Sequence, residues 1–339
     1  MRKFLKITTI ILTTLYLSFF NFSAFALKDG DTIRIIVPYS PGGGYDSQAR
    51  LAAPFVEKEI QKAGMPNAKV IVENIRGGGG AIATAQVFAS KPNGKTILFL
   101  DPESSIWQQA LSGAPFEVDK FSFIGQMSID PMVFMVRTNL GLNDFESVVK
   151  RSENTPILMG TSGKGGYDHI MPVIMQKMLN DSGHNIKFDY LHLDGTAPIL
   201  ASMKRGEVEA SLEVISTFGG AEEAGDIEFM FDFIEEDIPS GRWPDASKVT
   251  SIPADKLALL SSAMNYRRVF VTSPGVDSND LNILRNAFKN ALNNEELISK
   301  SIESRRPITF VDGDAIKELI ANEAQLAKQF TGIVKQQTK

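Results

Sequence analysis

The sequence contains no cysteine among its 339 residues. This absence excludes a disulfide framework, and it also excludes a lipid-modified N-terminal cysteine. In an oxidising compartment, stability must therefore come from packed cores alone. The roughly 313 residues beyond the N-terminal segment are enough to build two domains.

The chain also lacks an excess of positive charge, with 35 Lys and Arg against 40 Asp and Glu and a formal net charge of −5. A nucleic-acid partner requires a basic footprint, so we expect none. Long apolar runs are equally scarce. Beyond residues 7–22, no stretch is long and apolar enough to cross a bilayer.

The N-terminus has the pattern of an export signal. Residues 1–6 carry three positive charges, residues 7–22 are apolar with hydroxyls, and Ala24-Phe25-Ala26 has the small-x-small form of a cleavage site. We expect residues 1–26 to be a cleaved signal peptide and the mature protein, with a formal charge of −8, to be soluble in a bacterial periplasm. An uncleaved anchor is the alternative, but the apolar run is short for a membrane span.

Residues 38–50 form the joint around which the chain is organised. An apolar, β-branched run, Thr32–Val37, predicts a buried strand before it, and an amphipathic pattern predicts a helix after it. Two prolines stop the strand, and three glycines allow positive φ and close approach of a ligand to the backbone. The helix would begin with unpaired N–H groups, where an anion can bind. The alternative is a tight turn that uses glycine for geometry only.

Strands and helices are predicted to alternate along the rest of the chain, which indicates an α/β fold with parallel strands covered by helices. Expected strands are residues 69–73, 96–100, 121–126, 132–136, 156–159, 186–190 and 208–214. Expected helices are 45–63, 81–89, 143–150, 197–205, 278–292 and 315–334, and a further helix follows the joint at residues 160–169 and runs to about residue 179. Asp130-Pro131 is expected to break one strand from the next and to mark the first crossing into a second lobe. The chain is expected to recross near Ile252-Pro253, and the last two helices are expected to pack on the first lobe.

Two local details accompany this pattern. Asn143 with Glu146 has the spacing of a capping box. Pro172 fits the helix after the joint at residues 160–169 only if it lies in the first turn.

Other chemistries match the sequence poorly. The loop at residues 160–166 satisfies neither GxxxxGK[ST] nor GxGxxG, so a nucleotide site is not indicated. A hydrolase elbow, GxSxG, fails only because Lys164 stands at its last position, so a secreted serine hydrolase remains an alternative. A metal site from His169, Asp168, His192 and Asp194 lacks a tight ligand spacing, and we expect no metal and no cofactor.

Four motifs carry a resemblance to a known family. They are Ile35-Ile36-Val37-Pro38-Tyr39-Ser40-Pro41-Gly42-Gly43-Gly44-Tyr45-Asp46, Val72-Glu73-Asn74-Ile75-Arg76-Gly77-Gly78-Gly79-Gly80, Gly160-Thr161-Ser162-Gly163-Lys164-Gly165 and Val269-Phe270-Val271-Thr272-Ser273-Pro274-Gly275. In this order and spacing, the chain resembles the periplasmic solute-binding receptors of tripartite tricarboxylate transporters, the Bug/TctC-like extracytoplasmic solute receptors.

The resemblance implies a type II periplasmic-binding-protein fold, with two α/β lobes, a central cleft and two crossover segments. On this interpretation residues 27–129 and 250–339 form lobe 1, and residues 130–249 form lobe 2. The protein would be a monomeric binding protein rather than an enzyme.

The resemblance also implies that loops at the strand ends hold a carboxylate, largely through backbone N–H groups, hydroxyls and ordered water. Carried over to this sequence, the ligand-binding residues are Tyr39, Pro41, Gly42, Gly43, Gly44, Tyr45, Asp46, Gly160, Thr161, Ser162, Gly163, Gly165, Gly166, Tyr167, His169, Asp194, Gly195 and Thr196. Among these, Asp46 is expected to cap its helix and brace the loop rather than to touch an anion.

This sequence departs from the family pattern at two places. Gly166 replaces a hydroxyl residue, with the extra acid Asp168 beyond it, and Asp194 replaces a cation. Both changes leave open whether the far end of the ligand carries a charge. The match is poor over residues 218–253, where Glu235, Glu236 and Asp237 are expected to be a solvated face.

The implied function is capture of a small organic carboxylate in the cleft and delivery to the large and small subunits of a membrane permease. A solute sensor that presents the ligand to a membrane signalling protein is the alternative within the same fold. Thermal-shift screening of organic acids, and a Gly43→Val variant, would test this interpretation.

Overall fold

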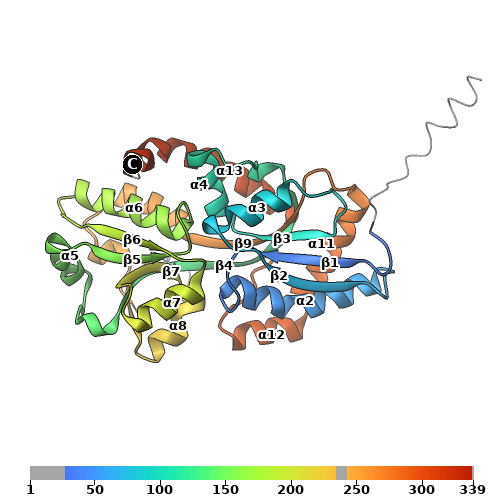
Figure 1. Ribbon diagram of the computed structural model, residues 1–339, viewed down its shortest axis with the longest axis horizontal. Coiled ribbons are helices and arrows are strands. Elements are labelled where there is room, and N and C mark those ends of the chain that lie inside the picture. Colours follow the sequence, from blue (N-terminus) through green and yellow to red (C-terminus); the bar gives the residue numbers. More distant parts are fainter. Residues whose placement is uncertain (1–26, 234–242, 338–339) are drawn as a thin grey trace, which may run out of the picture.

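The computed structural model describes residues 27–233 and 243–337 and shows a mixed α/β fold (Figure 1). The strands are β1 (Thr32–Val37), β2 (Lys69–Asn74), β3 (Thr96–Leu100), β4 (Ser122–Arg137), β5 (Ile157–Thr161), β6 (Phe188–His192), β7 (Ala210–Val214), β8 (Ile227–Asp232), β9 (Asn265–Thr272) and β10 (Val311–Asp312). Within the described ranges they form one ten-stranded sheet in the order β2-β1-β3-β9-β4-β7-β5-β6, with β8 and β10 also paired to β4.

Helices cover both faces of this sheet (Figure 1). They are α2 (Gly44–Lys62), α3 (Ala81–Phe88), α4 (Pro102–Ser112), α5 (Phe145–Asn154), α6 (Tyr167–Asp181), α7 (Thr196–Arg205), α8 (Ile215–Glu223), α9 (Ala246–Val249), α10 (Ala254–Ala263), α11 (Ser278–Leu292), α12 (Glu295–Glu303) and α13 (Gly313–Gln337). Short 3-10 turns lie at η1 (Gly78–Gly80), η2 (Val118–Lys120) and η3 (Thr138–Leu140). No helix in the described part of the chain is long and apolar enough to span a membrane.

Strand β4 joins the two halves of the molecule. Its first part pairs antiparallel with β9, from Ser122 to Pro131, and its second part pairs with β7 and β8. The expected break at Asp130-Pro131 is therefore wrong, because the strand continues through it. Pro131 is the last residue paired to β9, so the missing N–H falls where β4 changes partners.

Each half places its loops at one edge of its sheet. β1 pairs parallel with β2 and β3, and β5 pairs parallel with β6 and β7. The carboxyl ends of parallel strands meet at one edge, which is where α/β proteins bind ligands. The loops after β1 and β2 in one half, and those after β5 and β6 in the other, therefore open toward the junction.

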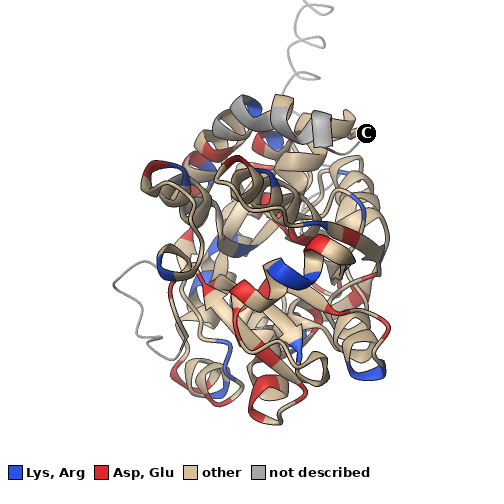
Figure 2. Ribbon diagram, turned by 90° about the vertical axis from the view of Figure 1, so that its left-hand side faces the viewer, with Lys and Arg blue, Asp and Glu red and all other residues tan. Residues whose placement is uncertain are grey.

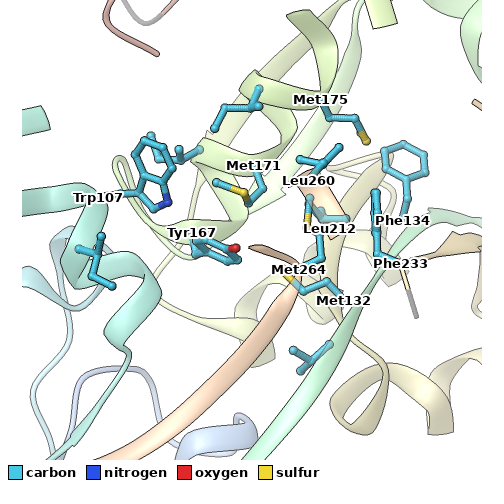
Figure 3. Packing of buried hydrophobic residues seen from close by; sticks show 14 of the residues in the cluster. Trp107, Met132, Phe134, Tyr167, Met171, Met175, Leu212, Phe233, Leu260 and Met264 are labelled. Atoms are coloured by element: carbon cyan, nitrogen blue, oxygen red, sulfur yellow. The ribbon is translucent and has the colours of Figure 1, made fainter. Parts of the chain in front are cut away.

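Buried apolar side chains run continuously through the junction. Figure 3 shows Tyr167 and Met171 of α6 near Trp107 of α4 and the Met132 and Phe134 side chains of β4. The same cluster includes Leu257 and Leu260 of α10, which follows the expected lobe boundary at residue 250. The boundaries at residues 129/130 and 249/250 stay a prediction.

The C-terminal helices differ in what they cover. Helix α11 packs against α2 in the first half, as expected, whereas α13 contacts α4, β4 and also α6 of the second half. The expectation that both helices pack on the first half alone is therefore wrong for α13, which lies over the junction (Figure 1).

Two local predictions need correction. The capping box belongs to Asp144 and Ser147 at the start of α5, one residue later than predicted. Pro172 is the sixth residue of α6 rather than part of its first turn. The α6 side chains around it, among them Met171, Val173 and Met175, are buried in the core, and this packing offsets the loss of a helical hydrogen bond at proline.

The segment that matched poorly, residues 218–253, contains most of α8, and β8 and α9. Trp243 packs against Phe229, with ring centroids 4.7 Å apart. The predicted solvated acids Glu235, Glu236 and Asp237 lie outside the described residues.

Candidate functional site

The first glycine-rich loop ends in a helix start that has no side-chain cap. Gly43 is the N-cap of α2, and it makes no side-chain hydrogen bond to the helix. Asp46 folds back on the loop, accepting the Gly42 N–H at 2.9 Å and the Arg50 Nε–H at 2.9 Å. Burial raises the pKa of Asp46, but these hydrogen bonds outweigh that effect and hold it below its usual value. The first-turn N–H groups of α2 therefore face the loop as an anion-binding end.

The second loop uses its polar groups differently. The Ser162 N–H and hydroxyl both donate to Asp168, the hydroxyl at 2.8 Å. The Gly165 N–H donates to His169 Nδ1 at 3.1 Å, and the Gly166 N–H donates to the Gly163 carbonyl at 3.0 Å. These donors are satisfied within the loop itself, so they are not free for a ligand in this arrangement.

The start of helix α6 also bonds to the first half. The Tyr167 N–H donates to the Ser104 hydroxyl at 2.8 Å, and that hydroxyl donates to the Asp101 carboxylate at 2.6 Å. Asp101 caps α4 and also accepts the Tyr39 and Tyr266 hydroxyls. A buried network therefore connects the second loop to the first half of the molecule.

The loops of the two halves touch across the junction. A Cβ atom at Gly163 (φ +155°) would lie 2.2 Å from the Gly79 nitrogen, so only glycine fits there. The Ser40 N–H donates to the Asp194 carbonyl at 2.9 Å, and Gly44 N lies 3.4 Å from Thr196 Oγ1. Arg76 Nε lies 3.7 Å from Asp194 Oδ2. The structure is therefore a closed arrangement of the two halves.

A cleft lies between these loops and encloses about 430 Å³ of space free of protein atoms, part of it open to solvent. It is lined by Tyr39, Gly43, Gly44, Tyr45, Met132, Ser162, Asp168, Gly195, Thr196, Glu213, Val214, Tyr266 and Arg268. These residues come from both halves and from both crossing strands, β4 and β9.

Arg268 supplies the positive charge of the cleft. It is 1% exposed, and its guanidinium lies over the rings of Tyr45 and Tyr266, at 5.1 and 5.8 Å from the centroids. One end of the guanidinium is paired with Asp130, whose carboxylate also accepts the Ser216 hydroxyl at 3.0 Å. Arg268 Nε has no hydrogen-bond partner among the described residues.

Asp168 and Glu213 supply the acidic side. Both are 5% exposed, and both line the cleft. Burial raises the pKa of Asp168 to about 6, against the lowering effect of the Ser162 hydroxyl and N–H. Burial also raises the pKa of Glu213 well above its usual value, and the neighbouring Asp168 carboxylate raises it further. Glu213 therefore holds its proton more strongly than Asp168 does.

The cleft collects only part of the predicted ligand set. It is lined by Tyr39, Gly43, Gly44, Tyr45, Ser162, Gly195 and Thr196. The lining omits Pro41, Gly42, Asp46, Gly160, Thr161, Gly163, Gly165, Gly166, Tyr167, His169 and Asp194. Which of these residues contact a ligand stays a prediction.

His169 lies behind the second loop. Its ring packs edge-on against Tyr190 and His192, each 4.8 Å away between centroids, and burial lowers its pKa to about 4. A neutral imidazole at this place accepts the Gly165 N–H and supports the loop. The hypothesised metal site is not formed, since no group of three metal-ligating side chains occurs in the part of the chain that the structure describes.

Two charged residues that line the cleft, Arg268 and Glu213, and Asp130, which pairs with Arg268, were not predicted as site residues. Arg268, Asp130 and Glu213 each lie in a strand whose other residues are mostly apolar. A charge inside such a strand is seldom buried without a partner, so this signal was available in the sequence. In the view of Figure 2, Lys and Arg are interspersed with Asp and Glu over the described residues, and no basic face is visible.

The fold and the cleft between its halves define a two-lobed binding protein of the periplasmic-binding-protein type. The sequence profile of the tripartite tricarboxylate transporter family receptor matches residues 57–331. The chain belongs to this family of receptors, and it is a binding protein rather than an enzyme.

Curated relatives match about half of this chain. A UPF0065 protein of Bordetella pertussis is 29% identical over 180 residues, 52% of each chain. Protein BugT of Bordetella pertussis is 23% identical over 189 residues, covering 53% of this chain and 54% of BugT. The chain thus spans about half the length of the curated relatives that it matches.

Solved structures share the fold over nearly the whole chain. The periplasmic binding protein BugD superimposes with a TM-score of 0.76 at 17% identity, covering 89% of this chain and 97% of BugD. MatC of Rhodopseudomonas palustris, with bound malate, gives a TM-score of 0.75 at 17% identity over 90% and 99% of the two chains. A further R. palustris protein, with adipate, gives 0.74 at 16% identity over 90% and 97%.

Proposed function

We propose that this receptor captures a small organic carboxylate in the cleft and delivers it to a tripartite tricarboxylate-type permease. The observation that carries the proposal is the uncapped start of α2, which lines the cleft at Gly43 and Gly44 next to Arg268. Helix N-termini and guanidinium groups both favour a carboxylate. Malate and adipate, bound by two proteins of the same fold, are ligands of this class.

The closed arrangement supports a capture mechanism. Contacts such as Ser40 with Asp194 and Tyr167 with Ser104 join the two halves directly. A ligand that touches both halves would add to these contacts and favour the shut state. Closure would then present one face of the receptor to the membrane subunits.

Export accompanies this function. The pattern of residues 1–26 supports a signal peptide that is cleaved before the receptor acts in the periplasm. Mass spectrometry of the exported protein tests this step, and an N-terminus at Leu27 is the expected result.

Thermal-shift screening with organic acids tests the binding function. We expect a carboxylate to raise the melting temperature, because a ligand that binds only the folded state stabilises it. Absence of stabilisation by every carboxylate tested would contradict the proposal.

Gly43→Val tests the place of binding. A Cβ atom at Gly43 would lie 2.7 Å from Thr196 Oγ1, so a larger side chain occupies the cleft at the start of α2. We expect ligand binding to be lost while the fold is kept. Gly220→Val is the matched control, because Gly220 lies in α8 with no atom within 4 Å of an added Cβ. Unchanged affinity in Gly43→Val would remove this loop from the site.

A further inference from the structure

Two carboxyl groups form one wall of the cleft. Glu213 lies on β7 and Asp168 in the first turn of α6, and each is 5% exposed. Asp168 is hydrogen bonded to Ser162. Glu213 in turn shares a hydrogen bond with the Asp168 carboxyl, and its other oxygen, Oε1, is buried and has no hydrogen-bond partner among the described residues.

An unpaired buried carboxyl oxygen is unfavourable, because it has lost water and gained no donor. Native structures leave few such atoms, and each calls for a physical explanation. Glu213 lines the cleft, so a donor on a ligand could reach it.

The other charges of the cleft leave this wall acidic. Arg268 is already paired with Asp130, so their charges largely compensate each other. Asp101 accepts hydrogen bonds from Ser104 and from two tyrosine hydroxyls. Its charge repels that of Asp168 and so raises the pKa of Asp168 further. Apart from Arg268, the other side chains that line the cleft are neutral. Arg268 attracts the Glu213 carboxylate and so opposes the rise in its pKa.

We propose that the ligand is a zwitterion, with its carboxylate at the start of α2 beside Arg268 and a protonated amine against Glu213 and Asp168. The proposal rests on the proposed function and narrows its ligand class to amino acids and related amino carboxylates. An ammonium group has donors only, and so matches a wall of acceptors. When the amine binds, the proton between the Glu213 and Asp168 carboxyls leaves to solvent, so that both can accept hydrogen bonds from the ammonium group.

A dicarboxylate fits this wall less well. Its second carboxylate would face two acids, and like charges in a buried site disfavour each other. Binding it would require both Asp168 and Glu213 to be protonated. Its affinity should therefore increase as the pH falls below about 6, the pKa of Asp168, whereas the affinity of a zwitterion should not.

The experiment measures binding by titration calorimetry to the mature receptor at pH 7.5 and pH 5. The probes are unbranched acids of two to six carbons in three matched classes: monocarboxylates, α- or ω-amino monocarboxylates, and dicarboxylates. We expect the best amino carboxylate to bind at least about tenfold tighter than the monocarboxylate and dicarboxylate of the same length at pH 7.5.

Glu213→Gln tests the residue, since it keeps the shape of the side chain and removes the acid. We expect the amino carboxylate to lose about tenfold or more in affinity, down to the level of the monocarboxylate. Glu228→Gln is the matched control on strand β8, which pairs with β4 and contributes no residue to the cleft lining, and it should bind as the unaltered receptor does.

The outcomes separate this proposal from the proposed function. If monocarboxylates or dicarboxylates bind as tightly as amino carboxylates at pH 7.5, the zwitterion is excluded and carboxylate capture stands. Equal affinity of an amino carboxylate for Glu213→Gln and the unaltered receptor would also overturn it. If no acid of any class binds, carboxylate capture fails as well.

Discussion

The two glycine-rich joints occupy equivalent places in the two halves, yet they present opposite chemistry to the cleft. In each, a glycine N-cap in extended backbone starts a helix, and an acid in the first turn folds back on the loop. Asp46 is neutralised by Arg50 and stays outside the cleft lining, whereas Asp168 lines the cleft with Glu213 beside it. The first joint therefore offers donors to a ligand, and the second offers acceptors.

This difference shows that a repeated strand-loop-helix pattern does not imply a repeated binding role. The Gly44 N–H at the first helix start makes only a long hydrogen bond, 3.4 Å, to Thr196 Oγ1, while the second loop satisfies its N–H groups with Asp168, His169 and Ser104. The cleft therefore has hydrogen-bond donors at one end and acceptors at the other. It can orient a ligand whose two ends differ.

Arg268→Met tests the donor end and should have the largest effect. It leaves Asp130 buried without its cation, and loss of one partner of a buried ion pair typically lowers the free energy of unfolding by about 3–5 kcal/mol. Urea denaturation measures this change. The control is Arg285→Met, whose partner Asp314 has a side chain 82% exposed, and which should cost less than about 1 kcal/mol. Similar losses of unfolding free energy in both variants would contradict the view that Arg268 and Asp130 form a buried ion pair.

The two acids that fold back on their loops should give opposite pH dependence of stability. Burial raises the pKa of Asp168 from 3.8 to about 6, so the folded chain holds the extra proton and stability falls as the pH rises through this window. The pKa of Asp46 is lowered, so its contribution is present above about pH 4 and is lost on further acidification.

Unfolding free energies of Asp168→Asn and Asp46→Asn, measured between pH 3 and pH 8, check this prediction. Relative to the unaltered protein, Asp168→Asn should gain on the order of 2–3 kcal/mol between pH 4 and pH 7. Asp46→Asn should instead lose stability above pH 4. If both variants changed the unfolding free energy in the same direction as the pH rises, the two joints would not differ in the way proposed.

Gly163→Ala should weaken ligand binding by about tenfold, because an added Cβ would lie 2.2 Å from the Gly79 nitrogen and hold the halves apart. Gly42→Ala is the matched variant in the first joint, since Gly42 has a φ of +85° but no atom closer than 4.0 Å to an added Cβ. It should lose about 1 kcal/mol of stability from backbone strain.

Titration calorimetry with an organic acid that raises the melting temperature distinguishes the two variants, because only Gly163→Ala is expected to lose affinity. Tight binding by Gly163→Ala would show that the contact between the loops is not needed for the closed complex.

Arg76→Ala should have the smallest effect. The Arg76 and Asp194 side chains are 64% and 46% exposed and lie 3.7 Å apart, so their attraction is screened by water and salt. We expect ligand affinity to change by less than about 1 kcal/mol, measured by titration in low and high salt. A larger loss would make this pair a major closing contact.

Much of the fold was predictable because its elements have strong local signals. β1 and β3 have the predicted bounds, α3 and β2 differ from the prediction by one residue at one end, and α2 is shifted by one residue at both ends. The errors fall where tertiary context overrides local preference. Pro131 lies inside a strand because β4 changes partners there, and Pro172 lies inside a helix whose side chains are buried around it.

The candidate site was predictable at its loops and not at its strands. Gly43, Gly44 and Ser162 carry a turn signal that the sequence shows directly. Arg268 and Glu213 lie in apolar strands, β9 and β7, that are far apart in the chain. They line the same cleft only because both strands pair with β4.

The sequence by itself determined the strand-loop-helix joint at residues 38–50, the alternation of elements and the bracing role of Asp46, because each depends on neighbouring residues. Tertiary structure decided which joint gives donors and which gives acceptors. That outcome depends on burial and on charges from distant strands, and these set the pKa of Asp168 and the pairing of Arg268 with Asp130.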